Sequence, residues 1–122
     1  MIGYVTLGAA DLERAAGFYD SLLADLGAKR VMENERMVLF GNGPGNPMIA
    51  VCKPFDGEAA SVGNGNMVAI AAGTKENVGK LHAKALELGG TDEGAPGPRG
   101  DTFYGGYFRD LDGNKLVAFV MG

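Results

Sequence analysis

The chain has little cysteine and little histidine, and each shortage excludes a class of site. Its single cysteine, Cys52, rules out a disulfide within the chain, and such cysteine usage is typical of a reducing compartment. Cys52 ends the apolar run 48–52, where an inert buried thiol is more common than a nucleophile. The only histidine, His82, cannot form a multi-histidine metal site. We expect it to be a partly exposed, structural side chain on a helix.

Basic charge and long apolar runs are also lacking. Lys and Arg number 11 against 15 Asp and Glu, for a net charge of −4, so there is no electrostatic footprint for nucleic acid or an anionic membrane. No apolar stretch approaches the roughly 20 residues of a membrane helix, and no basic segment typical of a signal peptide precedes the first strand pattern. Hydrophobic residues still make up 46% of the chain, which predicts a core. We expect one cytoplasmic domain, residues 1–122.

Glycine, in contrast, is abundant, with 21 of 122 residues. The glycine clusters at 41–47, 63–66 and 94–100 predict turns and loops between short strands. None carries the Gly-Lys-Ser/Thr sequence of a phosphate-binding loop. The segment 110–114 lacks the glycine and glutamate positions of an EF-hand, so its Asp, Gly and Asn residues predict a tight turn.

The first half of the chain predicts one helix among four strands. Residues 2–7 form a strand pattern, Asp11 is a good helix N-cap, and Gly27 is a typical helix stop. Further strands are expected at 29–32, 37–40 and 48–53. Between Asp11 and Gly27, apolar residues recur at three- and four-residue spacing and form one stripe: Leu12, Ala15, Phe18, Tyr19, Leu22, Leu23 and Leu26.

The second half predicts the same order of elements. Its expected elements are a strand from Met67, a helix at 75–88 capped by Thr74, a weak strand at 91–93, a Gly/Pro loop at 94–100, and strands at 103–109 and 115–121. The predicted fold class is therefore α+β on antiparallel strands. It consists of two βαβββ modules in tandem, residues 1–53 and 67–122, joined by a polar connector at 54–66.

The two modules also repeat in sequence. Shifted by 63 residues, Tyr4–Leu7 falls on Met67–Ile70, and shifted by 68 residues, Gly45–Val51 falls on Gly113–Phe119. A duplicated fold usually places its functional site between the copies, so the repeat indicates where to look for a site.

These features together resemble the vicinal oxygen chelate superfamily, which includes glyoxalase I, bleomycin-resistance proteins, extradiol dioxygenases and fosfomycin-resistance enzymes. The resemblance covers the whole chain and rests on the repeat, the start from Tyr4 through Asp11 to Tyr19, and the turn Phe108–Asn114. Leu111 stands where relatives usually have proline. The resemblance implies a glyoxalase-like fold in which each module's sheet curls into a half-barrel, with a cleft between the two. It also implies a homodimer.

Metal-dependent relatives hold one divalent ion with four side chains from the first and last strands of each module. Carried over, these positions fall on Tyr4, Ile49, Met67 and Val117. Isoleucine and valine have no donor atom, a thioether suits soft ions, and a phenol is a poor ligand. We therefore expect no metal and no other cofactor.

Strand alternation extends the list of candidate cleft residues. The expected lining is Tyr4, Thr6, Ile49, Met67, Ala69, Val117 and Phe119, with Tyr104 or Tyr107 and Arg99 or Arg109 at the mouth. The segment 99–109 can equally be a strand with ordinary aromatic packing or a cleft wall that offers rings and a guanidinium to an anionic or carbonyl group.

Three functions remain open from the sequence. The first is metal-free binding of a small, partly apolar molecule. The second is a related enzyme, of lyase or dioxygenase type, with a non-standard metal site or a metal-free site in which Tyr4 or Tyr107 acts as acid or base. The third is a structural protein whose cleft is vestigial and filled. Small residues on both first strands, such as Ala69, favour an open binding site.

Overall fold

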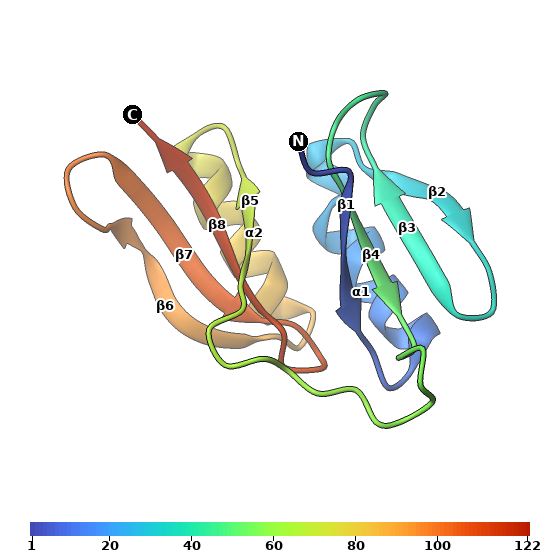
Figure 1. The fold of residues 1–122 in the computed structure, drawn as a ribbon. Coiled ribbons are helices and arrows are strands. Elements are labelled where there is room, and N and C mark those ends of the chain that lie inside the picture. Colours follow the sequence, from blue (N-terminus) through green and yellow to red (C-terminus); the bar gives the residue numbers. More distant parts are fainter. The chain divides into compact units, whose positions relative to one another are not determined.

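The computed structural model describes residues 1–122 as two compact units, Met1–Val62 and Gly63–Gly122. The division falls inside the predicted connector at 54–66. Each unit contains one four-stranded sheet and one long helix, as Figure 1 shows. No helix is long and apolar enough to cross a membrane. The expectation that both units form one domain stays a prediction.

The first unit has the predicted βαβββ order. Its elements are β1 (Tyr4–Gly8), α1 (Leu12–Leu22), the 3₁₀ helix η1 (Ala24–Leu26), β2 (Lys29–Glu33), β3 (Met37–Gly41) and β4 (Met48–Cys52). The Asp11 side chain caps α1 by accepting a hydrogen bond from the Arg14 amide at 3.1 Å. After η1, Gly27 takes a φ of 73°, a left-handed conformation that glycine adopts without a steric penalty.

The second unit repeats this order. Its elements are β5 (Val68–Ala71), α2 (Lys75–Glu87), β6 (Thr91–Pro98), β7 (Phe103–Arg109) and β8 (Lys115–Met121). Thr74 caps α2 by accepting a hydrogen bond from the Asn77 amide at 3.0 Å. In the tight turn between β7 and β8, the Asp110 carboxylate accepts hydrogen bonds from the Asp112 and Asn114 amides, both at 2.9 Å. The turn reading of this segment is therefore confirmed.

The two sheets share one topology. Their strand orders are β1-β4-β3-β2 and β5-β8-β7-β6, which confirms the predicted pair of βαβββ modules. The sheets are mixed, however, because the first strand of each module runs parallel to the last one. The other pairings are antiparallel, as expected. A parallel neighbour needs a long crossover, which the helix and the two intervening strands provide.

Strand β6 is longer than its sequence suggested. We expected a weak strand at 91–93 and a loop at 94–100, but β6 continues to Pro98. Its pairing with β7 shifts register between Asp92 and Gly94 and again between Gly94 and Gly97. Glycines at such bulges accept backbone conformations and close approaches that other residues resist. The loop prediction was therefore wrong at 94–98.

Each helix packs on one face of its own sheet. In the first unit, the Tyr19 ring of α1 lies 6.2 Å from the Phe40 ring of β3. In the second unit, α2 approaches β7 closely at Gly106, where a Cβ would lie 3.2 Å from the His82 ring. This close approach buries His82, which is 6% exposed, so the expected partial exposure was wrong.

The buried His82 has a polar partner on the same side of the sheet. Its Nε2 lies 3.0 Å from Asp92 Oδ1. The Gly94 amide, and then His82, hold the pKa of Asp92 below its usual value. The histidine thus links α2 to β6, which supports its predicted structural role.

Two glycines of the second unit make a matched stability test. A Cβ at Gly90 would lie 2.6 Å from the carbonyl oxygen of Arg109 and 2.8 Å from that of Ala85. Since both neighbours are backbone, Gly90→Ala should lower the free energy of unfolding by about 1–3 kcal/mol. Gly79, inside α2, has no atom within 4 Å of its Cβ position, and Gly79→Ala should raise stability by about 0.5–1 kcal/mol. Urea denaturation measures both, and equal effects would contradict this account.

Candidate functional site

The helix divides the second sheet into two faces. Gly106 meets His82 of α2, and the Lys75 ammonium at the start of α2 lies 5.3 Å from the centre of the Tyr104 ring. Residues 104, 106 and 108 of β7 therefore point toward the helix, and the alternate residues point to the other side. Tyr104, a predicted ligand contact, thus lies on the helix side, because it is an even number of residues from Gly106.

The centre of the helix-free face of the second sheet is aromatic and apolar. The rings of Phe103 and Phe119 stack with centroids 5.3 Å apart and planes 2° from parallel. Gly105 is the cross-strand partner of Phe119 and follows Phe103 by two residues on β7, and a Cβ there would be 2.8 Å from Phe103 and 3.1 Å from Val117. The absence of a side chain at Gly105 therefore makes room for this packing.

Small residues continue this face on the neighbouring strand. In the parallel pairing of β5 with β8, Ala69 is the partner of Val117 and Ala71 is the partner of Phe119. Partners in a sheet point to the same side, so Ala69, Val117 and Phe119 lie on one face, and their role as ligand contacts stays a prediction. Met67, just before β5, is 44% exposed.

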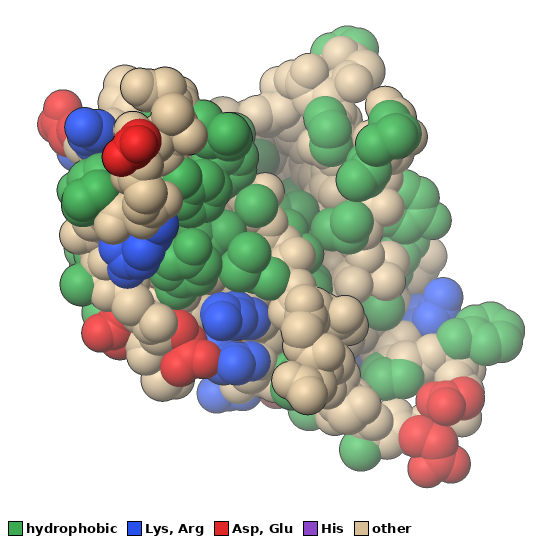
Figure 2. Space-filling view, turned by 60° about the vertical axis from the view of Figure 1, so that its left-hand side comes forward, with side chains coloured by type: hydrophobic (Ala, Val, Ile, Leu, Met, Phe, Trp, Pro, Cys, Tyr) green, Lys and Arg blue, Asp and Glu red, His purple; other side chains and the backbone are tan.

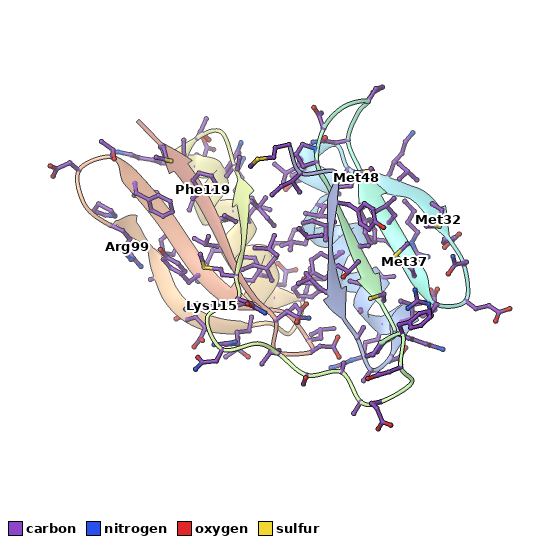
Figure 3. All side chains as sticks on the ribbon, in the orientation of Figure 1. Met32, Met37, Met48, Arg99, Lys115 and Phe119 are labelled. Atoms are coloured by element: carbon purple, nitrogen blue, oxygen red, sulfur yellow. The ribbon has the colours of Figure 1, made fainter.

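Two cations border the apolar centre on one side. The Arg99 guanidinium lies 5.4 Å from the centre of the Tyr107 ring, and the Lys115 ammonium lies 5.7 Å from it. Tyr107 is the cross-strand partner of Val117, which places the ring beside the apolar residues. Figure 3 labels Arg99 past the end of β6, and Lys115 and Phe119 along β8.

Arg109, the alternative predicted cation, is already paired. Its Nε donates to Glu93 Oε1 at 2.6 Å, and its Nη1 donates to the Gly113 carbonyl at 2.9 Å. Because the Glu93 carboxylate already compensates its positive charge, Arg109 attracts an anionic ligand less strongly. The structure therefore distinguishes the two predicted arginines, and Arg99 is the stronger candidate for binding a ligand.

The first sheet has a corresponding pair of faces, and its register corrects one prediction. Phe40 of β3 packs toward α1 and is the partner of Ile49, while Ile49 is also the partner of Val5. Ile49 therefore lies on the helix side, whereas Tyr4 and Thr6 lie on the helix-free face. The offset of 68 residues was wrong by one at this strand, and a slip of one residue moves a side chain to the opposite face.

The helix-free face of the first sheet is rich in sulfur. Pairing with β1 and β3 places Met48, Ala50 and Cys52 on the same side as Tyr4 and Thr6, and Met37 is the partner of Cys52. Figure 3 labels Met37 and Met48 on this sheet. Cys52 is partly exposed, so the expectation of a buried thiol was wrong. Methionines provide a flexible apolar surface that adapts to different shapes.

The positions that hold a metal in relatives offer poor ligands in both units. In the first unit they are Tyr4 and, with the corrected register, Ala50 in place of Ile49. In the second unit they are Met67 and Val117. Alanine and valine have no donor atom, so this set does not fit a hard or borderline divalent ion. The structure contains no group of three or more His, Cys, Asp and Glu residues that could hold a metal.

Comparison with known proteins gives the family. A family model of the glyoxalase/bleomycin resistance protein/dioxygenase superfamily matches residues 1–118. The chain belongs to this superfamily. A glyoxalase/bleomycin resistance protein from Albidiferax ferrireducens is 35% identical, with a TM-score of 0.88 over 98% of this chain and 97% of that one. A comparison with curated proteins finds no match.

Two more distant superfamily structures show the fold alone. A glyoxalase-related enzyme from Fulvimarina pelagi is 21% identical, with a TM-score of 0.77 over 98% of this chain and 86% of that chain. A lactoylglutathione lyase from Agrobacterium tumefaciens is 22% identical, with a TM-score of 0.71 over 98% of this chain and 92% of that chain. Both likenesses support the predicted glyoxalase-like fold.

Lys115 and Met48 were not identified from the sequence as residues of the helix-free faces of the second and first sheets. The alternation that grouped Val117 with Phe119 also reaches Lys115, two residues earlier, and this signal was present in the sequence. Met48 was missed because the assumed offset placed Ile49 on the wrong face. Its correct side follows only from the pairing of β4 with β1 and β3.

The corrected register predicts opposite roles for Ile49 and Tyr4. Ile49→Ala removes apolar contacts on the helix side and should lower the free energy of unfolding by about 2 kcal/mol. Tyr4 is 52% exposed, so Tyr4→Ala should cost clearly less. Thermal and urea unfolding of both variants measure the difference. A larger loss from Tyr4→Ala would contradict the assigned faces.

Proposed function

We propose that this superfamily member binds a small, partly apolar organic molecule without a metal. The observation that carries this proposal is the helix-free face of the second sheet, where the stacked rings of Phe103 and Phe119 share a face with the small side chain of Ala69. Figure 2 shows hydrophobic side chains bordered by Lys and Arg side chains. Apolar surface with a few polar groups is typical of small-molecule sites.

Binding is a better proposal than catalysis for the two candidate tyrosines. A side chain used as a nucleophile or base usually has an activating neighbour within hydrogen-bond reach. Neither Tyr4 nor Tyr107 has a side-chain hydrogen bond to another group of the chain. We still propose ligand contacts for Tyr4 and Thr6, on the helix-free face of the first sheet, and for Met67, just before β5.

A substitution on the small side of this face tests the proposal. Ala69 is exposed, so Ala69→Phe should leave the melting temperature nearly unchanged and abolish binding by filling the space beside Val117. The matched control is Ala83→Phe, on the exposed surface of α2, which should keep binding. Thermal-shift screening of small organic molecules, with and without EDTA, finds the ligand and measures its affinity.

The outcomes of this test separate the alternatives. Equal binding by wild type and Ala69→Phe would refute the site. Loss of binding in EDTA would refute the metal-free proposal. A large fall in the melting temperature of Ala69→Phe, with no ligand found, would favour a face that is already filled.

We also propose a homodimer in the cytoplasm. Both sheets have open edge strands, and apolar side chains such as Ile2, Val31 and Met121 are 55%, 51% and 63% exposed. Association covers edges and apolar surface of this kind. The single unpaired cysteine is compatible with a reducing compartment.

The dimer has a direct test. Light scattering at about 50 µM protein should give twice the 12.6 kDa mass of the chain, since homodimers are the commonest assemblies. The apolar variant Met121→Glu, at an exposed position, should shift the mass toward that of the monomer if this region is covered. A monomeric mass for the wild type would rule the dimer out.

A further inference from the structure

We propose that the ligand carries a carboxylate, which Arg99 and Lys115 bind beside the Tyr107 ring. This inference rests on the proposed function, since it names the chemical class of the molecule bound on the helix-free face of the second sheet. Three observations support it: the way Arg99 is held, the lack of acidic partners for both cations, and their position at the border of the apolar centre.

Arg99 is held in place by the backbone of the strand it follows. Its Nη2 donates to the Ala95 carbonyl at 2.8 Å, and its Nη1 donates to the Pro98 carbonyl at 3.3 Å. A Cβ at Gly94 or at Gly97 would lie 3.2 Å from one of its terminal nitrogens. The guanidinium thus lies close over a glycine-containing strand. It is oriented before any ligand arrives, which reduces the entropy cost of binding.

The two cations also differ from Arg30 and Arg109 in lacking an acidic partner. Arg30 donates to Asp20 at 3.0 and 2.8 Å and to Glu33 at 2.7 Å, and these carboxylates raise its pKa. Arg109 has Glu93. Arg99 and Lys115, in contrast, make no ion pair within the chain.

The local charge on this face is therefore positive although the chain carries a net charge of −4. Lys115 is the cross-strand partner of Arg109, and like charges placed opposite each other destabilise a sheet pair. The single carboxylate of Glu93 neutralises one of these three cations. An incoming anion would compensate the remaining charge.

The positions of the two cations relative to the apolar residues of β8 indicate what kind of acid would bind. Lys115, Val117 and Phe119 alternate along one face of β8, and Tyr107 pairs with Val117 across from them. Val117 is fully buried, so a molecule that places a carboxylate near Lys115 and Arg99 extends its body over this residue toward the partly exposed Phe119. The best fit is an aromatic or branched aliphatic acid. A guanidinium and an ammonium bind carboxylates through charge-assisted hydrogen bonds.

Phenylacetate and its neutral analogue phenylacetamide test the inference, because they differ chiefly in charge. Both are titrated into uniformly ¹⁵N-labelled full-length protein, and the amide resonances are followed by NMR. Phenylacetate should shift the amides of Gly94, Tyr107 and Val117. Its affinity should exceed that of phenylacetamide by roughly tenfold, as expected for charge-assisted hydrogen bonds.

Charge-removing variants identify the groups responsible. Arg99→Gln and Lys115→Gln should each weaken phenylacetate binding by roughly fivefold to tenfold and leave phenylacetamide binding unchanged. Lys115→Gln disturbs no backbone hydrogen bond, so it remains informative if Arg99→Gln alters β6. The matched control is Lys80→Gln on α2, where Lys80 lies 3.3 Å from Glu76. It changes the net charge equally and should not affect binding.

The results distinguish this inference from the proposed function. Equal binding of both compounds at these residues would refute the carboxylate and retain the binding face. An equal loss of phenylacetate binding in Lys80→Gln would also refute it, because the effect would then come from overall charge. Failure of both compounds to shift these amides would refute the inference together with the proposed face. The expected pattern supports both.

Discussion

The register between the first and last strands of each module determines the rest of this structure. Where β5 runs beside β8, Ala69 lies opposite Val117, and every second residue along both strands follows to the same side. One side packs against α2 and forms the core. The other side carries the fully buried Val117 and the partly exposed Phe119. A shift of one residue would exchange the two sets and place Ile70 and Leu116 away from the helix.

The same constraint gives the two faces of the second sheet different surroundings. Residues on the helix side are constrained by packing, as where Gly106 leaves room for His82 to approach β7 closely. On the opposite side, Phe103 and Phe119 stack, and Tyr107 lies near two cations. Superfamily members that use a metal concentrate their chemistry in a few ligand positions. Here those positions hold Tyr4 and Ala50 in the first unit and Met67 and Val117 in the second, which offer a poor set of ligands for such an ion.

Much of the fold could be predicted from the sequence because its signals are local. The caps at Asp11 and Thr74, the stop at Gly27 and the alternating strands depend on neighbouring residues, and the internal repeat adds the order of elements. The extent of β6 could not be predicted, since glycine and proline usually indicate a loop, and only pairing with β7 shows that 94–98 is a strand.

The candidate site was less accessible from the sequence for the same physical reason. Choosing between Arg99 and Arg109 required knowing that Glu93 reaches Arg109, and placing Tyr104 and Ile49 required knowing which face each helix covers. These are contacts between segments that are distant in sequence. Periodicity shows which residues share a face of one strand, but not which face the helix will cover.

The glycines beneath Arg99 have a consequence for how recognition could change among related proteins. A methyl group at position 97 would meet the guanidinium at 3.2 Å and push it away from the strand, although that residue itself offers no functional group to a ligand. The position of the Arg99 guanidinium thus depends on the size of the side chains on the strand below it. Replacement of a glycine beneath Arg99 could therefore change the selectivity between acidic and neutral molecules, even where every charged and aromatic side chain is retained.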